Sequence, residues 1–296
     1  AYRFLPSKAP LILQNMLATV PPSLTYIPDF VSPEEEQRLL DKVYSAPLPK
    51  WTILKNRRLQ TWGCTPLATK NNTALYEPLP VWLAPVADRI AQELPIVFEF
   101  DGKHEKANNC LINEVILFQI EITVFFNYRA LTPSSKYLPN QGIFPHLDGP
   151  AYKPTVATVS LGEYTILEFY KRRNLDQDLV GDDYDIQHDA SSQQQQQEDG
   201  IRRRKPDFRF ILKPRSLVIL QQDMYESYLH GISEVDQDIV SAGSVDNWVE
   251  AGMEEELQSS GGDGAVTLKR VNARVSLTFR VAAKVSKITS LFGKKR

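Results

Sequence analysis

Apolar residues recur at helical spacing in two stretches near the start of the chain. The first stretch begins at Ser32, and its apolar positions at 39, 40, 43 and 44 share one helix face. Ser32 can cap the helix and Glu35 completes a capping box, while the early glutamates complement the helix dipole. The second stretch covers residues 80–94. The pattern therefore predicts two amphipathic helices.

From about residue 109 the period changes to that of β-strands. Short apolar or alternating segments separated by turn signals predict strands at 110–114, 155–161, 164–170, 208–212, 216–220, 227–232 and 274–281. The region 51–69, between the helices, is expected to hold short strands or loops. Many short strands favour a sandwich or barrel, so the fold class is mainly β with an α/β beginning.

Two polar segments interrupt the strands. Residues 171–207 contain an acidic stretch, five consecutive glutamines and a basic run at 202–205. Residues 234–264 are acidic and rich in glycine and serine. Such compositions bury too little apolar surface to offset the entropy of ordering, so we expect both segments to be mobile surface insertions.

The composition is that of a protein with a sizeable core. Of 296 residues, 42% are hydrophobic, which fits one large domain or two small ones. The 34 basic and 36 acidic residues nearly cancel, which excludes a global basic field but not a local patch. Two cysteines fit a reducing compartment. The chain has neither an apolar span nor a secretory signal, so we expect no membrane contact. We also expect a monomer located in cytoplasm and nucleus.

Two of the four histidines lie in patterns that suit a metal site. His146 and Asp148 are two residues apart, so both side chains point to one side of an extended segment. His230 lies in a predicted strand. Two imidazoles and one carboxylate suit ferrous iron and leave three positions for cosubstrate and oxygen. An isolated His-x-Asp pair is common, however, and His104 and His188 are expected to be solvated in polar loops.

The last predicted strand, 274–281, alternates completely. Its apolar side consists of Val275, Leu277, Phe279 and Val281, and its polar side of Arg274, Ser276, Thr278 and Arg280. If the apolar side packs on the core, Arg274 and Arg280 point into one polar space. Guanidinium groups bind carboxylates bidentately, so this face suits a dicarboxylate such as 2-oxoglutarate. The alternative is an edge strand with its arginines in solvent.

The order His146-x-Asp148, His230, Arg274-x5-Arg280 resembles the AlkB-type iron(II)/2-oxoglutarate dioxygenases. Further motifs are similar to the AlkB homologue six subgroup: PHLDGPxYxPTV at 145–156, SLG at 160–162, PRSL at 214–217 and LHGI at 229–232, with YxPDF at 26–30, PKWT at 49–52 and LQxWG at 59–63 upstream. The resemblance spans about residues 21–281, apart from the interruptions.

The resemblance implies a double-stranded β-helix (jelly roll) with an N-terminal α/β extension that shapes a substrate lid. The corresponding divisions are an ill-defined segment at 1–20, the extension at 21–108, the core at 109–283 with insertions at 115–136, 171–207 and 234–264, and a basic tail at 284–296. It also implies that His146, Asp148 and His230 bind iron. Arg274 would pair with the distal carboxylate of 2-oxoglutarate, and Arg280 would lie near its iron-chelating end.

The family places an Asn-x-Tyr motif before the first histidine, and both residues contact 2-oxoglutarate. Here these residues correspond to Asn113 and Tyr137, separated by the 22 residues of 115–136 (136 − 115 + 1). We favour a retained intron: a valine codon begins with the GT of a donor site, and a lysine codon can end in the AG of an acceptor. The alternative is a genuine extra hairpin beside the site.

The expected activity is oxidation of N-alkylated RNA or DNA, which consumes 2-oxoglutarate and O2, releases succinate and CO2, and frees formaldehyde from a methylated base. The alternatives are a catalytically weak nucleic-acid-binding module on the same fold and a protein side-chain hydroxylase. The basic positions 202–205, 209, 213 and 215 suit either phosphate contacts or a solvated charge run. Trp51, Trp62 and Tyr152 suit either base stacking or the core.

Overall fold

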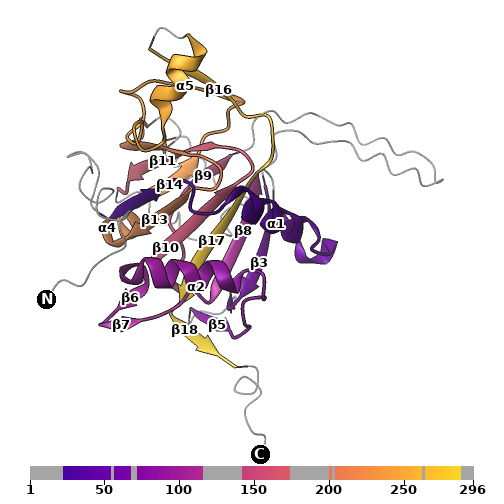
Figure 1. Ribbon diagram of the computed structural model, residues 1–296. Coiled ribbons are helices and arrows are strands. Elements are labelled where there is room, and N and C mark those ends of the chain that lie inside the picture. Colours follow the sequence, from indigo (N-terminus) through magenta and orange to yellow (C-terminus); the bar gives the residue numbers. More distant parts are fainter. Residues whose placement is uncertain are drawn as a thin grey trace, which may run out of the picture.

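The computed structural model describes residues 23–54, 57–67, 72–115, 142–173, 200–201, 204–261 and 264–287. Two sheets face each other in it, and helices cover the outer side of the larger sheet (Figure 1). The larger sheet has the order β1 (Leu24–Ile27), β13 (Leu217–Gln221), β10 (Tyr152–Leu161), β17 (Arg274–Ala282), β8 (Asn109–Val115), β3 (Arg58–Gly63) and β2 (Thr52–Ile53). The smaller sheet has the order β12 (Phe208–Leu212), β11 (Thr165–Lys171), β14 (Tyr228–Ile232) and β9 (Ile143–His146). All pairings within both sheets are antiparallel, and the predicted jelly-roll class is confirmed.

The two predicted helices are α1 (Pro33–Tyr44) and α2 (Ala84–Glu93). The capping box of α1 is confirmed: the Glu35 amide donates to Ser32 Oγ at 3.2 Å, and the Ser32 amide donates to Glu35 Oε2 at 3.0 Å. The second helix starts later than predicted because residues 80–83 form a turn in which the Leu83 amide bonds the Pro80 carbonyl at 2.9 Å. None of the helices in the described residues is long and apolar enough to cross a bilayer.

The predicted alternation of the last strand is confirmed. Val275, Leu277, Phe279 and Val281 enter the core that α1 and α2 form against the larger sheet. The opposite positions of β17 face the smaller sheet and line a pocket there. A second apolar cluster fills the space between the sheets, where Leu24, Val156, Leu167 and Leu220 meet. The arginines of β17 are therefore buried between sheets and do not lie on a solvated edge.

The expectation of a mobile insertion at 234–264 is wrong. This segment forms β15 (Gln237–Val240) and α5 (Met253–Ser260), and β15 pairs with the following β16 (Val266–Lys269). Five of its apolar side chains, Val240, Val245, Trp248, Ala251 and Met253, pack with Ile166 and Ile211 on the outer side of the smaller sheet. The composition misled because those few residues share one partner surface.

Several shorter elements complete the described chain. They are the helical turns η1 (Leu48–Lys50), η2 (Pro95–Phe98) and α4 (Gln222–Glu226), with the strands β4 (Thr65–Pro66), β5 (Thr73–Leu75), β6 (Glu99–Phe100), β7 (Lys103–His104) and β18 (Lys284–Ser286). The predictions for residues 1–20, for 116–136 and for most of 171–207 and of the tail lie outside the described residues.

Candidate active site

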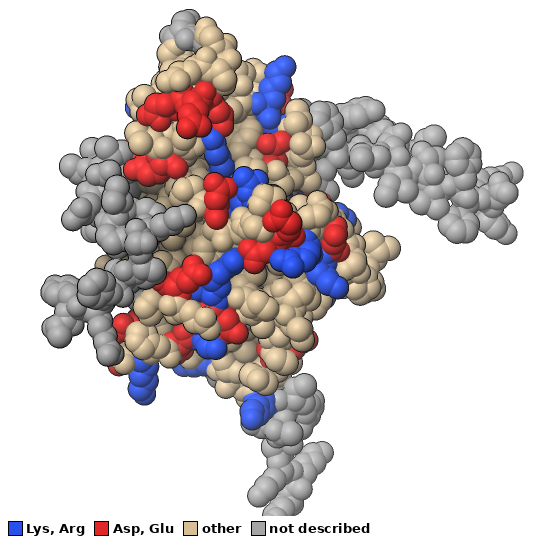
Figure 2. Space-filling model, in the orientation of Figure 1, with Lys and Arg blue, Asp and Glu red and all other residues tan. Residues whose placement is uncertain are grey.

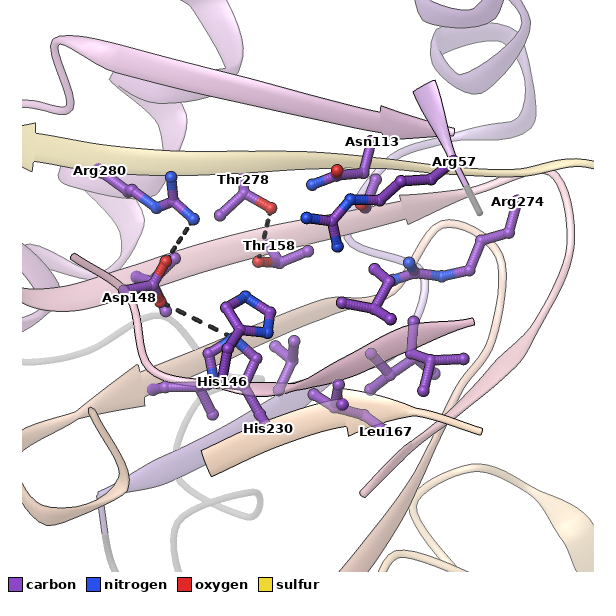
Figure 3. Close-up of a pocket in the computed structure, with 18 residues that line it drawn as sticks. Arg57, Asn113, His146, Asp148, Thr158, Leu167, His230, Arg274, Thr278 and Arg280 are labelled. Carbon is purple, nitrogen blue, oxygen red and sulfur yellow. Dashed lines mark hydrogen bonds and ion pairs between the residues drawn. The ribbon is translucent and has the colours of Figure 1, made fainter. Parts of the chain in front are cut away.

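A pocket lies between the two sheets, at the polar face of β17 (Figure 3). One wall comes from the larger sheet, and the other comes from β9, β14 and β11 of the smaller one. The predicted site residues that line it are Asn113, His146, Asp148, His230, Arg274 and Arg280. Sequence positions more than 150 residues apart thus contribute to one cavity.

The two histidines face each other across the pairing of β9 with β14. His146 is the register partner of His230, and their ring centroids are 4.7 Å apart. Gly231 allows this approach, because a Cβ there would lie 2.8 Å from the Ile143 carbonyl oxygen. Asp148 follows β9, with its Oδ2 at 3.9 Å from His230 Nε2. The fold therefore brings together the three side chains for which the sequence predicted a shared site.

The donor set suits a first-row metal. His146 Nδ1 lies 2.8 Å from the Phe144 carbonyl oxygen, and donation along this contact leaves the lone pair on Nε2. Asp148 is buried and adds a carboxylate oxygen. The three side chains come close without forming a complete coordination geometry, since no group of three or more His, Cys, Asp or Glu residues in the described chain is arranged to hold an ion.

Arg280 helps to fix the position of the Asp148 carboxylate. Its Nη2 donates a charge-assisted hydrogen bond to Asp148 Oδ1, and both side chains are buried. The guanidinium also lies over the Tyr152 ring, 4.7 Å from its centroid. Arg280 is thereby fixed beside the metal-ligand candidates, at the end of the pocket opposite Arg274 (Figure 3).

Arg274 is a buried cation whose surroundings suit an anion. Its Nη2 donates to Ser160 Oγ at 3.0 Å, whereas its Nε is buried without a hydrogen-bond partner among the described residues. Burial, and to a smaller extent the neighbouring charge of Arg270, together lower the pKa of Arg274 to about 10. A carboxylate ligand would relieve both effects.

Asn113 lies on β8, where it pairs with Ser276 of β17. Its Oδ1 is buried and has no hydrogen-bond partner among the described residues. The amide therefore lies beside the space between Arg274 and Arg280, as the sequence predicted for a cosubstrate contact. Tyr137, its predicted companion, lies outside the described residues.

Sequence reasoning missed two polar residues of the pocket, Arg57 and Thr158, whereas Thr278 belongs to the predicted polar side of the last strand. The Thr158 hydroxyl donates to Thr278 Oγ1 at 3.2 Å across β10 and β17. Arg57 immediately precedes β3 and is 5% exposed. The signal that could have found Arg57 is the strand alternation of β3, which is visible only once the pairing of β3 with β8 is known.

The two tryptophans serve the core and not the pocket. Trp62 pairs with the core residue Cys110 and meets Trp82 edge to face, with centroids 5.8 Å apart. Trp51 packs against the same core, and Arg58 lies over its ring. Tyr152 alone of the three aromatic candidates lies beside a pocket residue, Arg280. Both tryptophans pack on the helix-covered face of the larger sheet, away from the pocket, so neither is placed to stack on a base held there.

Three of the five described basic residues that were proposed for phosphate contacts form ion pairs with acidic side chains. Arg209 lies 3.4 Å from Glu168, Arg215 lies 2.9 Å from Asp29, and Lys213 pairs with Glu256. Figure 2 shows basic and acidic side chains interleaved over the described residues of this face. The phosphate-contact interpretation is therefore weakened for these three residues. Arg202 and Arg203 lie outside the described residues.

Comparison with known proteins gives several similarities. No family model matches the chain. The probable RNA/DNA demethylase ALKBH6 of Danio rerio is 35% identical over 275 residues, covering 93% of this chain and 92% of that protein. The tRNA (carboxymethyluridine(34)-5-O)-methyltransferase alkbh8 of Xenopus tropicalis is 24% identical over 91% of this chain and 33% of its own length. Among solved structures, OsALKBH1 aligns with a TM-score of 0.45 and 13% identity, covering 88% of this chain and 99% of that chain.

Proposed function

Since this chain belongs to the AlkB family of iron(II)- and 2-oxoglutarate-dependent dioxygenases, in the subgroup of AlkB homologue 6, we propose that it oxidises N-alkylated bases in RNA or DNA. The reaction would consume 2-oxoglutarate and O2, and release succinate and CO2. An N-methyl group would leave as formaldehyde after hydroxylation. The similarity to the Danio rerio protein, a probable RNA/DNA demethylase, supports this substrate class.

One observation carries the proposal: two facing imidazoles and a buried carboxylate share a pocket with a buried arginine whose Nε has no partner among the described residues. The first three groups have the chemistry of a facial iron site. The last has the chemistry of a carboxylate receptor. A binding site for iron together with a chelating dicarboxylate needs both.

Each residue then has a distinct role. His146, Asp148 and His230 would hold iron(II), which supplies the redox chemistry that activates oxygen. Arg280 holds the Asp148 carboxylate in place, and Arg274 would bind the distal carboxylate of 2-oxoglutarate. The apolar side chains of the pocket, Val156, Leu167, Val218, Leu220 and Ile232, limit the access of water to the reacting groups.

The test is turnover of 2-oxoglutarate to succinate by the purified chain with iron(II), with and without N-methylated RNA and DNA oligonucleotides. We expect succinate and formaldehyde to form with at least one oligonucleotide, and His230→Ala to abolish both. Oligonucleotide binding without any turnover would favour the binding-module alternative. Failure to bind 2-oxoglutarate at all would defeat the proposal. The monomeric state and the location in cytoplasm and nucleus belong to the same proposal.

A further inference from the structure

Arg57 lies on the pocket face of the larger sheet, although it comes from the N-terminal extension. Leu59 of β3 pairs with Asn113 of β8, which pairs with Ser276 of β17. Asn113 and Ser276 line the pocket, so this row faces it. Because successive side chains alternate, residue 57 points to the same side as residue 59.

The neighbouring arginine, Arg58, points to the other face of the sheet. Arg58 pairs in register with Glu114, and Glu114 with Val275, which belongs to the helix-covered core. Arg58 accordingly forms an ion pair with Glu114 and lies over Trp51 on that outer side. Two consecutive arginines thus have opposite environments, and only Arg57 enters the pocket.

Arg57 and Arg274 lie on opposite sides of β8, level with Val115. Val115 at the end of β8 pairs with Arg274, and Arg57 precedes the strand that lies on the other side of β8. Two strand spacings separate the backbones of the two arginines by about 10 Å. Figure 3 shows the Arg57 guanidinium entering the pocket between Thr278 and Arg274, below Asn113. Both side chains can therefore reach one ligand from two sides.

The pocket carries more positive than negative charge. Among the described residues that line it are three arginines and one carboxylate, so its formal charge with neutral histidines is +2 (3 − 1). Asp148 is bound to Arg280, at the far end from Arg274. Removing the charged guanidinium of Arg274 from water is unfavourable unless an anion compensates it. A dicarboxylate supplies two negative charges, and bound iron would increase the attraction.

We propose that Arg57 is a second guanidinium for the distal carboxylate of 2-oxoglutarate, acting with Arg274 to select a dicarboxylate over a monocarboxylate. The inference rests on the proposed function, because it assigns a further residue to the same cosubstrate. Arg57 binds and selects the cosubstrate and takes no part in the oxidation itself.

The test compares two ligands that differ only at the distal group: 2-oxoglutarate, and 2-oxopentanoate, which has a methyl group there. Dissociation constants up to the millimolar range are measured anaerobically with iron(II) present. For Arg57→Ala we expect weaker binding of 2-oxoglutarate by about tenfold or more and a change of less than about twofold for 2-oxopentanoate. Arg57→Lys should retain part of the selectivity. Arg38→Ala, which removes an exposed arginine of α1, is the control.

The opposite outcomes are equally clear. Equal weakening of both ligands would show a merely structural role, and unchanged binding of 2-oxoglutarate would show no role; either overturns the inference while the proposed function stands. If Arg57→Ala does not fold, Arg57→Gln preserves most of the side-chain volume and carries the same comparison. A wild-type chain that does not bind 2-oxoglutarate defeats the proposed function and this inference together.

Discussion

Arg280 and Asp148 form a buried ion pair across the pocket, although they are 132 residues apart in sequence. The pair joins β17 of the larger sheet to the segment that follows β9 of the smaller one. It therefore holds the two walls of the pocket together at the end where the histidines lie (Figure 3). Neither charge is tolerated there without the other.

Replacing Arg280 should destabilise the fold through this pair. For Arg280→Ala, measured by urea denaturation without added metal, we expect the free energy of unfolding to fall by about 3–5 kcal/mol, because Asp148 is left as an unpaired buried charge. Asp148→Asn added to this variant should recover much of the loss. A single variant as stable as wild type would contradict the importance of the pair.

Arg274 should govern the cosubstrate and not the metal. We expect Arg274→Ala to weaken 2-oxoglutarate binding by about 10- to 100-fold, because a buried charge-assisted contact is lost. The affinity for iron(II) alone, titrated separately, should stay within about threefold of wild type, since Arg274 lies at the other end of the pocket from the ligand candidates. Equal losses of both affinities would remove Arg274 from this role.

The lowered pKa of Arg274 gives a pH dependence with a definite sign. Burial, and then the charge of Arg270, lower this pKa from the ordinary value of an arginine to about 10 in the folded chain. The unfolded chain therefore binds more protons between these values, and the unfavourable contribution of Arg274 to stability diminishes as pH rises through that range. Cosubstrate binding needs the protonated guanidinium, so affinity for 2-oxoglutarate should fall above about pH 10. Titrations between pH 8 and 11 test this, and Arg274→Ala should lack the fall.

Trp248 should be essential to the folded structure of the segment 234–264. Its side chain is 6% exposed and packs in the cluster on the outer side of the smaller sheet, whereas Val249 is 68% exposed. We expect Trp248→Ala to lower the free energy of unfolding by about 3–5 kcal/mol and to increase amide exchange in α5. Val249→Ala is the matched control and should change stability by less than about 0.5 kcal/mol.

Deleting residues 115–136 should move Tyr137 into the position of Val115. Val115 ends β8, pairs with Arg274 and is buried. Tyr137 would then stand two residues after Asn113 on the same face, as in the Asn-x-Tyr motif. The intron hypothesis expects this deletion to improve solubility, thermal stability and 2-oxoglutarate binding. Unfolding of the shortened chain would instead support a genuine hairpin.

The sequence alone determined the features that depend on near neighbours in the chain. The capping box of α1 joins residues three apart. The side chains of β17 alternate with a period of two, so its arginines face the pocket and its apolar residues face the helix-covered core. The His146-x-Asp148 spacing is equally local, and the order of the motifs identified the family before any distance was known. In such cases the covalent backbone itself fixes the relative directions of the side chains.

Only the tertiary structure decided the features that depend on pairing between distant segments. Arg57 and Arg58 are indistinguishable by type and neighbourhood, and the register of β3 on β8 alone assigns one to the pocket and the other to Glu114. In the same way, the five buried apolar residues of 234–264 form a cluster because Ile166 and Ile211 present a surface to them. A one-residue change of register would reverse every side chain of β3 without altering its composition.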